Sequence, residues 1–376
     1  MRRTLGLSTS LIIVLLGLLS GGRSVWAQAH PPLEYKCGPV LDRFKIYSLY
    51  WGQWTPDQIK DQQDYLKGLA AYISGAGAPK GQEPMLQQYG VNEASVAGYA
   101  TANPKAAKSL TKEEIVNIIK NNAEKLPAFD AHTLIIVFPG KGSSLTFGPG
   151  RGYHHSESNT AFWAAVPQNA GPTLALVTAH EVFEAATDPA DDNSTGWISA
   201  NNSEAVDQCN SPGYPFITLS FGQIPGAADN TQGGTCSTTG YIAAQKRFDS
   251  ISFDIVTGGD DLRGDSSATA SICFPGGSRT FTLKSQSDGG WNNNSAHVKT
   301  FATGPALPLS FLGSITITLT SHNSFPETDD NWDIHRVRVT VKGPGGSACV
   351  LDQTGTPLSR LTGSRPSVTL YRGKGC

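Results

Sequence analysis

One helix-forming stretch sets the strongest constraint on how this chain can fold. Thr173 is the expected N-cap of the helix, and Asp188-Pro189 is the expected stop. Between them the sequence is mostly apolar, but it also carries His180, Glu181 and Glu184. A largely apolar helix packs against other elements of a core. We therefore expect part of its charged face to be buried as well.

The spacing of these polar residues matches a known type of metal-binding helix. His180 and Glu184 project from the same face, one turn apart, because they are separated by four positions. Glu181 lies beside them, with its carboxylate directed at the space in front of the helix. This is the layout of the HExxH zinc helix, with glutamate in place of the second histidine.

The sequence around this helix contains acids but no bases. From position 152 to position 245 there is no lysine and no arginine. The acidic residues of the same window are Glu157, Glu181, Glu184, Asp188, Asp191, Asp192, Glu204, Asp207 and Asp229. Asp188 also lies at the negative end of the helix dipole, which is unfavourable for an acid. Either these acids are all solvated or a cation lies among them, and packing of the helix against a sheet favours the cation.

Several short motifs resemble those of a known protein family. The segments HEVFEAATDP (180–189), GW (196–197) and EAVDQC (204–209) resemble the HELxEAxTDP…GW…GEIxDxC pattern of secreted bacterial proteins related to the plant phosphate-induced, Exordium-like family. Upstream, GYH (152–154) and LYWG (49–52) match further segments of that family. The resemblance covers roughly residues 40 to 240. Plant members often lack the HExxE acids, so membership alone does not imply an active metal site, but this chain has them.

The first functional hypothesis is a secreted metal-dependent hydrolase that resembles zinc metallopeptidases. His180 and Glu184 are the expected helix ligands, Glu204 the expected third ligand, and Asp207 the alternative to Glu204. A water molecule would fill the fourth position. One imidazole and two carboxylates leave zinc near neutrality, so slow chemistry or another metal such as manganese also fits.

Two further residues have expected catalytic roles. Glu181 would act as the general base that accepts the proton of the attacking water. His154, from the GYH segment, would be an extra ligand or a hydrogen-bond donor to a developing oxyanion. The adjacent His155 is expected to be an inert surface residue. The substrate would be a protein or peptide that the sequence does not identify.

The second hypothesis belongs to another class, a non-catalytic secreted binding protein. In that case the acidic cluster would hold a structural ion, and the C-terminal part of the chain would carry the function. Plant relatives without the acids favour this alternative. The two hypotheses differ in the expected metal site, since an enzyme needs an open coordination position and a structural ion is enclosed by protein ligands.

Periodicity predicts an α+β chain, with a zincin-like α/β domain followed by an all-β sandwich domain. The boundaries are a signal peptide at 1–27, the metal-site domain at 28–248 and the sandwich at 249–376. In the first domain we expect strands at 44–51, 132–138 and 159–166, and helices at 55–73 and 111–126. After Phe248 the sequence consists of short alternating runs separated by turns, which is typical of a sandwich.

The C-terminal region resembles PLAT/LH2-type modules in two strings, TGGDDLR (257–263) and DNWDIHRV (330–337). The resemblance implies contact with lipids, proteins or polymer surfaces. Four acids near these strings could bind Ca²⁺ through oxygen ligands, although acidic turn residues also occur for local reasons. They are Asp260, Asp261, Asp329 and Asp330.

The N-terminus and the cysteines predict export. Basic residues, a short apolar run and small residues up to Ala27 make a signal peptide, and no stretch reaches the length of a transmembrane helix. Six cysteines in an exported chain predict disulfides whose connectivity the sequence leaves open, with Cys209–Cys236 and Cys349–Cys376 as attractive pairs. A net charge of −2 without a basic run argues against nucleic acid as a partner. We therefore expect a secreted or periplasmic protein.

Overall fold

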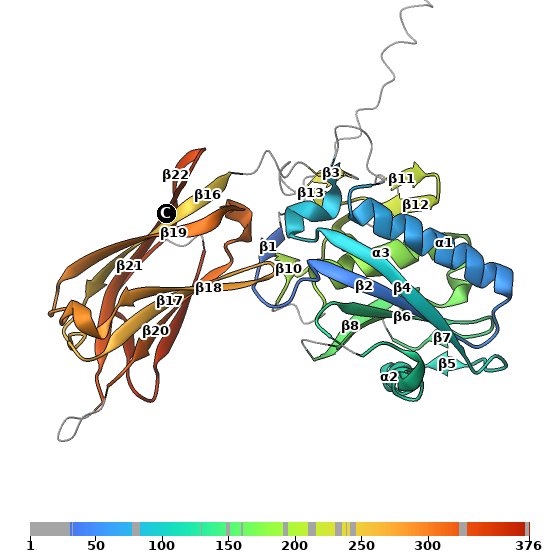
Figure 1. The fold of residues 1–376 in the computed structure, drawn as a ribbon, viewed down its shortest axis with the longest axis horizontal. Coiled ribbons are helices and arrows are strands. Elements are labelled where there is room, and N and C mark those ends of the chain that lie inside the picture. Colours follow the sequence, from blue (N-terminus) through green and yellow to red (C-terminus); the bar gives the residue numbers. More distant parts are fainter. Residues whose placement is uncertain are drawn as a thin grey trace, which may run out of the picture.

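The computed structural model describes residues 31, 33–76, 83–128, 130–147, 151–158, 161–190, 195–209, 216–229, 235–237, 239–240, 246–322, 329–372 and 376. The predicted signal peptide (1–27) and the acids Asp191 and Asp192 lie outside these residues. Figure 1 shows that the elements up to β15 gather on one side of the molecule, and β16 to β23 on the other. We refer to these parts as the first and second halves.

A five-stranded sheet forms the centre of the first half. Its strands follow the order β4-β2-β6-β9-β8. They span Glu93–Ala102 (β4), Arg43–Trp51 (β2), Thr133–Pro139 (β6), Ala161–Ala165 (β9) and Tyr153–Ser158 (β8). The first four are parallel, and β8 is an antiparallel edge strand. Every residue of β6 is buried, as expected for a parallel strand covered on both faces.

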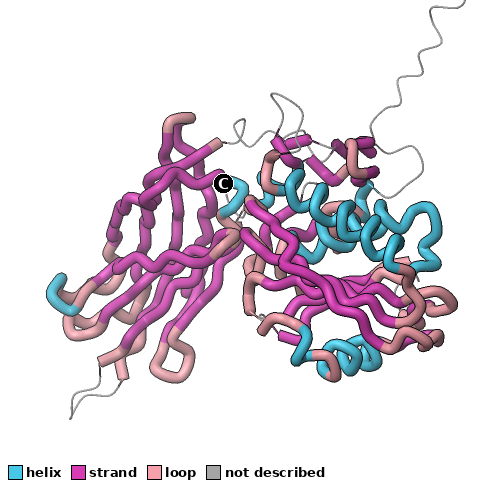
Figure 2. Tube along the Cα trace, turned by 45° about the vertical axis from the view of Figure 1, so that its right-hand side comes forward, coloured by secondary structure: helices cyan, strands magenta, loops and turns pink. Residues whose placement is uncertain are grey.

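Helices cover both faces of this sheet. α1 (Pro56–Ile73) and α3 (Leu174–Thr187) share one hydrophobic cluster on one face, whereas α2 (Lys112–Lys120) contributes to a second cluster on the other. Figure 2 shows helical segments above and below the strands. The predicted start of α1 is confirmed, because Thr55 caps the helix in a capping box with Gln58 and Pro56 occupies the first turn.

Short strand pairs complete the first half. Each joins segments of two to four residues that show little periodicity in the sequence. The pairs are β1 (Leu33–Tyr35) with β10 (Trp197–Ser199), β3 (Glu83–Pro84) with β15 (Thr239–Gly240), β5 (Ser109–Leu110) with β7 (Ser144–Leu145), β11 (Phe216–Leu219) with β12 (Gly222–Pro225), and β13 (Ala227–Asp229) with β14 (Thr235–Ser237). Among the residues that the structure describes, this half also contains the 3-10 helices η1 (Met85–Tyr89), η2 (Ala123–Lys125), η3 (Gln168–Thr173) and η4 (Asp207–Cys209).

The second half contains two four-stranded antiparallel sheets, ordered β19-β16-β21-β22 and β18-β17-β20-β23. The strands are β16 (Arg247–Thr257), β17 (Ser267–Phe274), β18 (Gly277–Lys284), β19 (Ala296–Pro308), β20 (Ser314–Thr320), β21 (Trp332–Gly343), β22 (Gly346–Leu361) and β23 (Ser367–Tyr371), with short 3-10 helices η7 (Gln286–Asp288) and η8 (Leu309–Phe311). Inward-facing residues of both sheets form one buried cluster that includes Phe253, Ile317 and Trp332.

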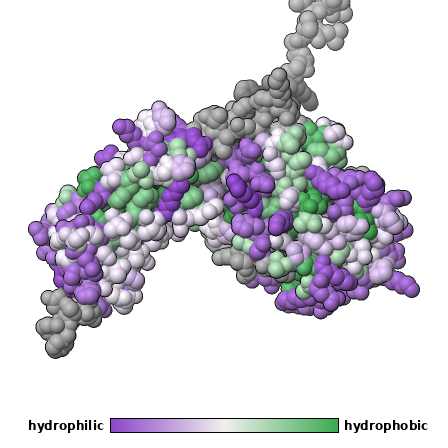
Figure 3. Space-filling view, viewed as in Figure 1, coloured by the Kyte–Doolittle hydropathy of each residue, from purple (hydrophilic) through white to green (hydrophobic). Residues whose placement is uncertain are grey.

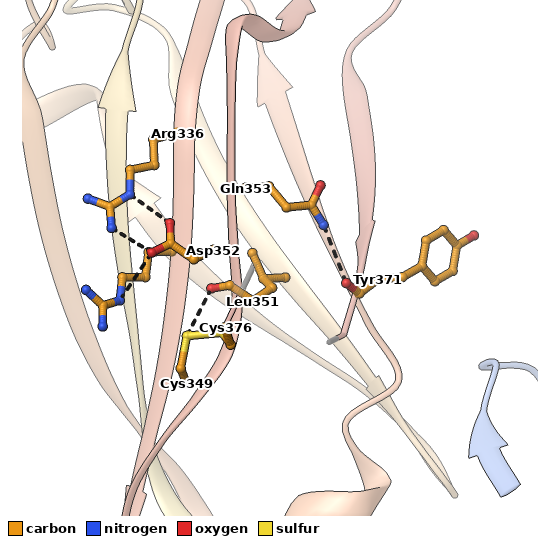
Figure 4. The surroundings of a disulfide bond; sticks show 8 residues. Arg336, Cys349, Leu351, Asp352, Gln353, Tyr371 and Cys376 are labelled. Atoms are coloured by element: carbon orange, nitrogen blue, oxygen red, sulfur yellow. Dashed lines mark hydrogen bonds and ion pairs between the residues drawn. A yellow bond between two sulfur atoms is a disulfide. The ribbon is translucent and has the colours of Figure 1, made fainter. Parts of the chain in front are cut away.

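The end of the chain is fixed to this half. The Cys349–Cys376 disulfide joins β22 to the C-terminal residue (Figure 4). On the neighbouring strand β21, Arg336 donates two hydrogen bonds to Asp352 of β22, at 2.8 and 2.7 Å. The guanidinium of Arg336 accordingly holds the pKa of Asp352 below its usual value.

The predicted fold class is wrong. We expected a zincin-like α/β domain followed by an all-β sandwich, but the chain is mostly β. Its described residues contain three α-helices and eight sheets, five of which have only two strands. The physical reason is that short segments without local periodicity form extra strands, some paired with a neighbour in sequence and others, such as β1 with β10 and β3 with β15, with a distant segment. Such pairing depends on tertiary contacts rather than on intrinsic preference.

The two halves are joined by packing and by a covalent bond. Phe311 of η8 packs against Trp197 of β10, with 6.1 Å between ring centroids. The Cys37–Cys273 disulfide joins the segment after β1 to β17. On the face drawn in Figure 3 a broad notch separates the halves below this junction. None of the helices in the described part of the chain has the length and apolar character that a membrane-spanning segment needs.

Candidate metal centre

The helix α3 forms as the sequence predicts and carries two buried carboxylates. It spans Leu174–Thr187, and Thr187 closes its last turn by donating a hydrogen bond to the carbonyl of Phe183. Glu181 is 5% exposed and Glu184 is 2% exposed. Burying a carboxylate is costly unless a hydrogen bond, an ion pair or a metal compensates for the lost water. Their surroundings therefore decide what this helix does.

His180, Glu184 and Asp207 form the first group of possible ligands. Nε2 of His180 lies 2.9 Å from Oε2 of Glu184 and 3.4 Å from Oδ1 of Asp207. The backbone N–H of Asp207, at the start of η4, donates to Oε1 of Glu184 at 3.0 Å. One ligand atom from each of the three residues lies within 4.8 Å of the others. The loop that follows β10 thus brings Asp207 to the face of α3.

His154 brings a second group together from strand β8. Its Nδ1 atom lies 3.5 Å from Oε2 of Glu181 and 4.0 Å from Oε2 of Glu184. Its Nε2 atom lies 3.0 Å from the carbonyl oxygen of Asp188 and 3.4 Å from Oε1 of Glu204. Because a carbonyl only accepts, Nε2 carries a proton and Nδ1 faces the two glutamates. Glu184 belongs to both groups, so all six predicted site residues form one cluster.

The glycine of the GYH motif, Gly152, is required by a close contact with Glu181. A Cβ atom at this position would lie only 2.3 Å from Oε1 and 2.8 Å from Cδ of Glu181. Any other residue at position 152 would therefore have to displace the Glu181 carboxylate. The sequence indicated that this segment belongs to the site, but the need for a glycine depends on the approach of β8 to α3, which periodicity does not reveal.

The histidines and acids of the cluster change each other's protonation. Burial lowers the pKa of His154, but Glu204 and Glu181 outweigh burial and raise it well above its ordinary value. The pKa of His180 is raised in the same way, because Glu184 and Asp207 outweigh the lowering of the pKa by burial. Burial raises the pKa of Glu184. A hydrogen bond from His180 lowers the pKa of Asp207.

Glu204 differs from Glu184 in the direction of its net pKa shift. Burial raises the pKa of Glu204, but the positive charge and hydrogen bond of His154 outweigh burial, and the net pKa is lowered. Its position at Nε2 of His154 also places it in the second group rather than with His180. The geometry therefore favours Asp207 over Glu204 as the partner of His180 and Glu184. The sequence-based choice of Glu204 as third ligand stays a prediction.

Three other predicted positions have different surroundings. His155 is half-buried, with its ring edge-on to Trp163 at 5.7 Å, so it is a packing residue rather than a purely surface one. In the second half, Asp260 pairs with Arg360 at 2.6 Å, and Asp330 pairs with Arg263 at 3.0 Å. Two of the four acids expected to bind calcium thus form ion pairs with arginine.

Comparisons with known proteins give no family. No family model matches the chain, and no curated protein matches it. Similar solved structures include alpha toxin from Clostridium absonum, with 16% identity over 34% of this chain and 32% of that chain, and a TM-score of 0.27. Metalloproteinase-II from Bacteroides fragilis has 12% identity over 40% of this chain and 46% of that chain, and a TM-score of 0.25. Coral 8R-lipoxygenase has 12% identity over 33% of this chain and 17% of that chain, and also scores 0.25.

The chain spans less than half the length of each of these proteins. Similarities at such TM-scores do not establish a shared fold, so the functional argument depends on the cluster itself.

Proposed function

We propose that this chain is an exported metal-dependent hydrolase, similar in chemistry to zinc metallopeptidases. The observation that carries the proposal is the cluster of two imidazoles and four carboxylates around α3, in which His154, Glu181 and Glu184 are buried. Among the described residues, the ion pairs of these carboxylates are with histidines and not with lysine or arginine. A divalent cation is the simplest charge that would compensate for burying so many acids together.

The donor atoms fit zinc in type and spacing. Ligands bound at about 2.0–2.2 Å in a tetrahedron lie roughly 3.3–3.6 Å apart. The His180–Asp207 separation of 3.4 Å falls within that range, and the His180–Glu184 separation of 2.9 Å is slightly shorter. We therefore assign His180, Glu184 and Asp207 as the residues that would hold the metal. Glu204 and His154 complete the surroundings of Glu184.

The remaining residues have roles in hydrolysis that follow from their positions. Zinc bound in such a site would polarise a substrate carbonyl and lower the pKa of the attacking water. Glu181, beside the ligand residues and in contact with His154, is placed to accept the proton of that water. His154 is held by the Asp188 carbonyl and presents Nδ1 to Glu181, so it orients the base.

The exposure of the cluster favours catalysis over a structural ion. The side chain of Asp207 is 51% exposed and that of His180 is 16% exposed, whereas that of Glu184 is 3% exposed. The metal would thus be reached from the Asp207 side by water and substrate. A structural ion is normally enclosed by its protein ligands.

A structural role remains the second candidate, and one observation favours it. The cluster draws its residues from β8, α3 and the segment that contains η4, so an ion there would also join three separate parts of the first half. In that case Glu181 would help to hold the ion and would not act as a base.

We also propose that the chain is related to the secreted bacterial proteins similar to the Exordium-like family. The support is that residues of the GYH, HExxE and ExxDxC segments meet in one cluster, although they are spread over positions 152–209. Three disulfides support export.

Metal analysis of the purified protein, together with two variants, tests the enzyme proposal. Glu184→Ala should lose the metal, whereas Glu181→Gln should keep it and lose hydrolysis of labelled casein, used as a general protein substrate. Glu157→Gln is the matched control, because Glu157 is an exposed acid on the same strand as His154. Metal-free wild-type protein, or hydrolysis unchanged in Glu181→Gln, would end the assignment.

A further inference from the structure

The central sheet has a switch point between β2 and β6. The two strands are parallel neighbours, and their last residues Trp51 and Pro139 lie side by side. After β2 the chain enters α1, which packs on the face shared with α3. After β6 it passes to the opposite face, where Leu145 joins the cluster of α2. Where neighbouring parallel strands send the chain to opposite faces, a crevice opens beyond their carboxyl ends, and ligands bind in such crevices.

A cleft lies at this switch point. Its volume is about 580 Å³, which is within the usual range for sites of small ligands. Trp54 and Gln58 line it from the β2–α1 side, Lys141 from the segment after β6, and Leu174 from the start of α3. The cleft does not belong to the metal centre, because it shares none of its residues.

The N-terminus of α1 is unsuited to phosphate, the ligand that switch-point helices often bind. Pro56 has no N–H to offer. The N–H groups of Thr55 and Gln58 are already bound to each other's side chains in the capping box. Asp57 adds a negative charge to the first turn. At this end of α1 an anion would therefore meet few backbone donors and an unfavourable charge.

The lining instead suits an uncharged ligand with many hydroxyl groups. Four residues with side-chain amides line the cleft, namely Gln58, Gln62, Gln168 and Asn169. The Oε1 atom of Gln58 accepts from Thr55 and the Nε2 atom of Gln62 donates to Thr178, so the amides of Gln168 and Asn169 carry most of the argument. An amide offers donors and acceptors at once, as hydroxyl groups require. The formal charges of the lining, from Asp61 and Lys141, cancel.

Trp54 adds a fixed aromatic surface to the cleft. Its Nε1 donates a hydrogen bond to the carbonyl of Phe138 at 3.0 Å. Its ring packs edge-on against Tyr50 at 5.1 Å and against Phe138 at 6.1 Å. The indole is half-buried and already held in position, so little side-chain entropy is lost when a ligand packs against it.

We propose that this cleft binds a neutral carbohydrate, with the apolar face of a sugar ring packed on Trp54 and its hydroxyl groups bonded to the surrounding amides. The site adjoins α3 directly, since Gln62 donates from Nε2 to Oγ1 of Thr178 at 3.0 Å. Metal-free protein should bind the sugar equally well, because the cleft and the metal centre share no residues.

Fluorescence titration of the full exported chain tests the proposal with cellohexaose, maltohexaose and N-acetylchitohexaose as probes. Trp54 is half-buried, whereas the other tryptophans that the structure describes are buried, so it should dominate any change on binding. At least one of the three sugars should give a saturable change. Trp54→Ala and Asn169→Ala should each weaken binding by about tenfold or more, which is 1.4 kcal/mol.

Asn117→Ala is the matched control, because Asn117 is an exposed asparagine on α2, across the sheet from the cleft. It should bind like the wild type. Asn169 is exposed, so its variant keeps the test valid if Trp54→Ala fails to fold. Absence of binding by all three sugars at millimolar concentration would overturn the proposal, as would equal binding in Asn169→Ala and Asn117→Ala. Displacement of the sugar by inorganic phosphate would contradict the neutral ligand class.

Discussion

Nε2 of His180 lies 2.9 Å from Oε2 of Glu184, one turn further along α3. The other oxygen of Glu184 accepts the backbone N–H of Asp207 at 3.0 Å. Each end of the carboxylate thus has a partner, and its orientation toward His180 is fixed by the fold. A pair of side chains held in place in this way would need little rearrangement to bind a cation.

Replacing Glu184 by alanine should remove the metal and destabilise the protein. The variant loses a proposed ligand and removes the acceptor of the part-buried backbone N–H of Asp207, a hydrogen bond typically worth about 0.5–1.5 kcal/mol. Metal binding free energy is also folding free energy, so the loss adds to that amount. Metal content and thermal unfolding before and after chelation measure the two contributions. Chelation should lower the unfolding temperature of the wild type and of Glu157→Gln, but not that of Glu184→Ala.

Replacing Glu181 by glutamine should separate binding from catalysis. The side chain keeps its size and one oxygen, but it no longer accepts a proton. Metal content should stay at the wild-type level while the rate of hydrolysis falls by about 10²–10⁴-fold. Loss of metal from this variant would show instead that Glu181 helps to hold the ion.

Gly152→Ala should displace the carboxylate of Glu181. Its Cβ would overlap Oε1 of Glu181, so the side chain has to move within a packed site at a cost of about 1–3 kcal/mol. We expect reduced hydrolysis with the metal retained. Denaturant unfolding of Gly152→Ala, Glu181→Ala and the double variant forms a cycle. The glycine replacement should cost less when Glu181 is absent, and equal costs would contradict the contact.

The stability that His154 and His180 contribute to the chelated protein should fall as pH rises. The pKa values of His154 and His180 are raised in the folded state, above unfolded values of about 6.5. Their protonation therefore contributes stability fully below pH ~6.5, and the contribution is lost as pH rises through the folded pKa values. In the proposed site a metal would require the neutral imidazole of His180, so its binding should strengthen as pH rises.

The gap between the unfolding temperatures of metal-loaded and chelated protein should consequently widen from pH 6 to pH 8, as followed by circular dichroism. Acid should destabilise both forms, because Asp207 and Glu204 have lowered pKa values whose contribution is lost as pH falls through them. A gap that narrows with rising pH would contradict the role of His180.

The sequence indicates local features of this protein well. The capping box of Thr55 and the boundaries of α3 follow from side chains within a few positions of each other, and the structure has both. The meeting of His154 with α3 was suggested by motif order. In contrast, the pairing of β1 with β10 joins Leu33 to Ser199, and no local pattern predicts a contact over that separation. The predicted fold class was wrong for the same reason, and no local pattern indicates the switch-point cleft.

Asp207 shows which part of the site could not be predicted from the sequence. Sequence spacing leads us to expect Glu204 as the third ligand and Asp207 as the alternative, and both precede Cys209 on the same segment. Their roles separate only when η4 turns Asp207 toward His180 and leaves Glu204 at His154. Such a turn depends on how the segment packs, which composition and spacing do not determine.

The Cys37–Cys273 disulfide turns most of the chain into a closed ring. It joins residues 236 positions apart, and the central sheet, α3 and the whole cluster lie within that ring. A single cut by a protease anywhere inside the ring breaks the backbone but leaves both pieces in one molecule. The redox state of the surroundings would therefore decide when the covalent link of a nicked molecule is lost, and the protease alone would not.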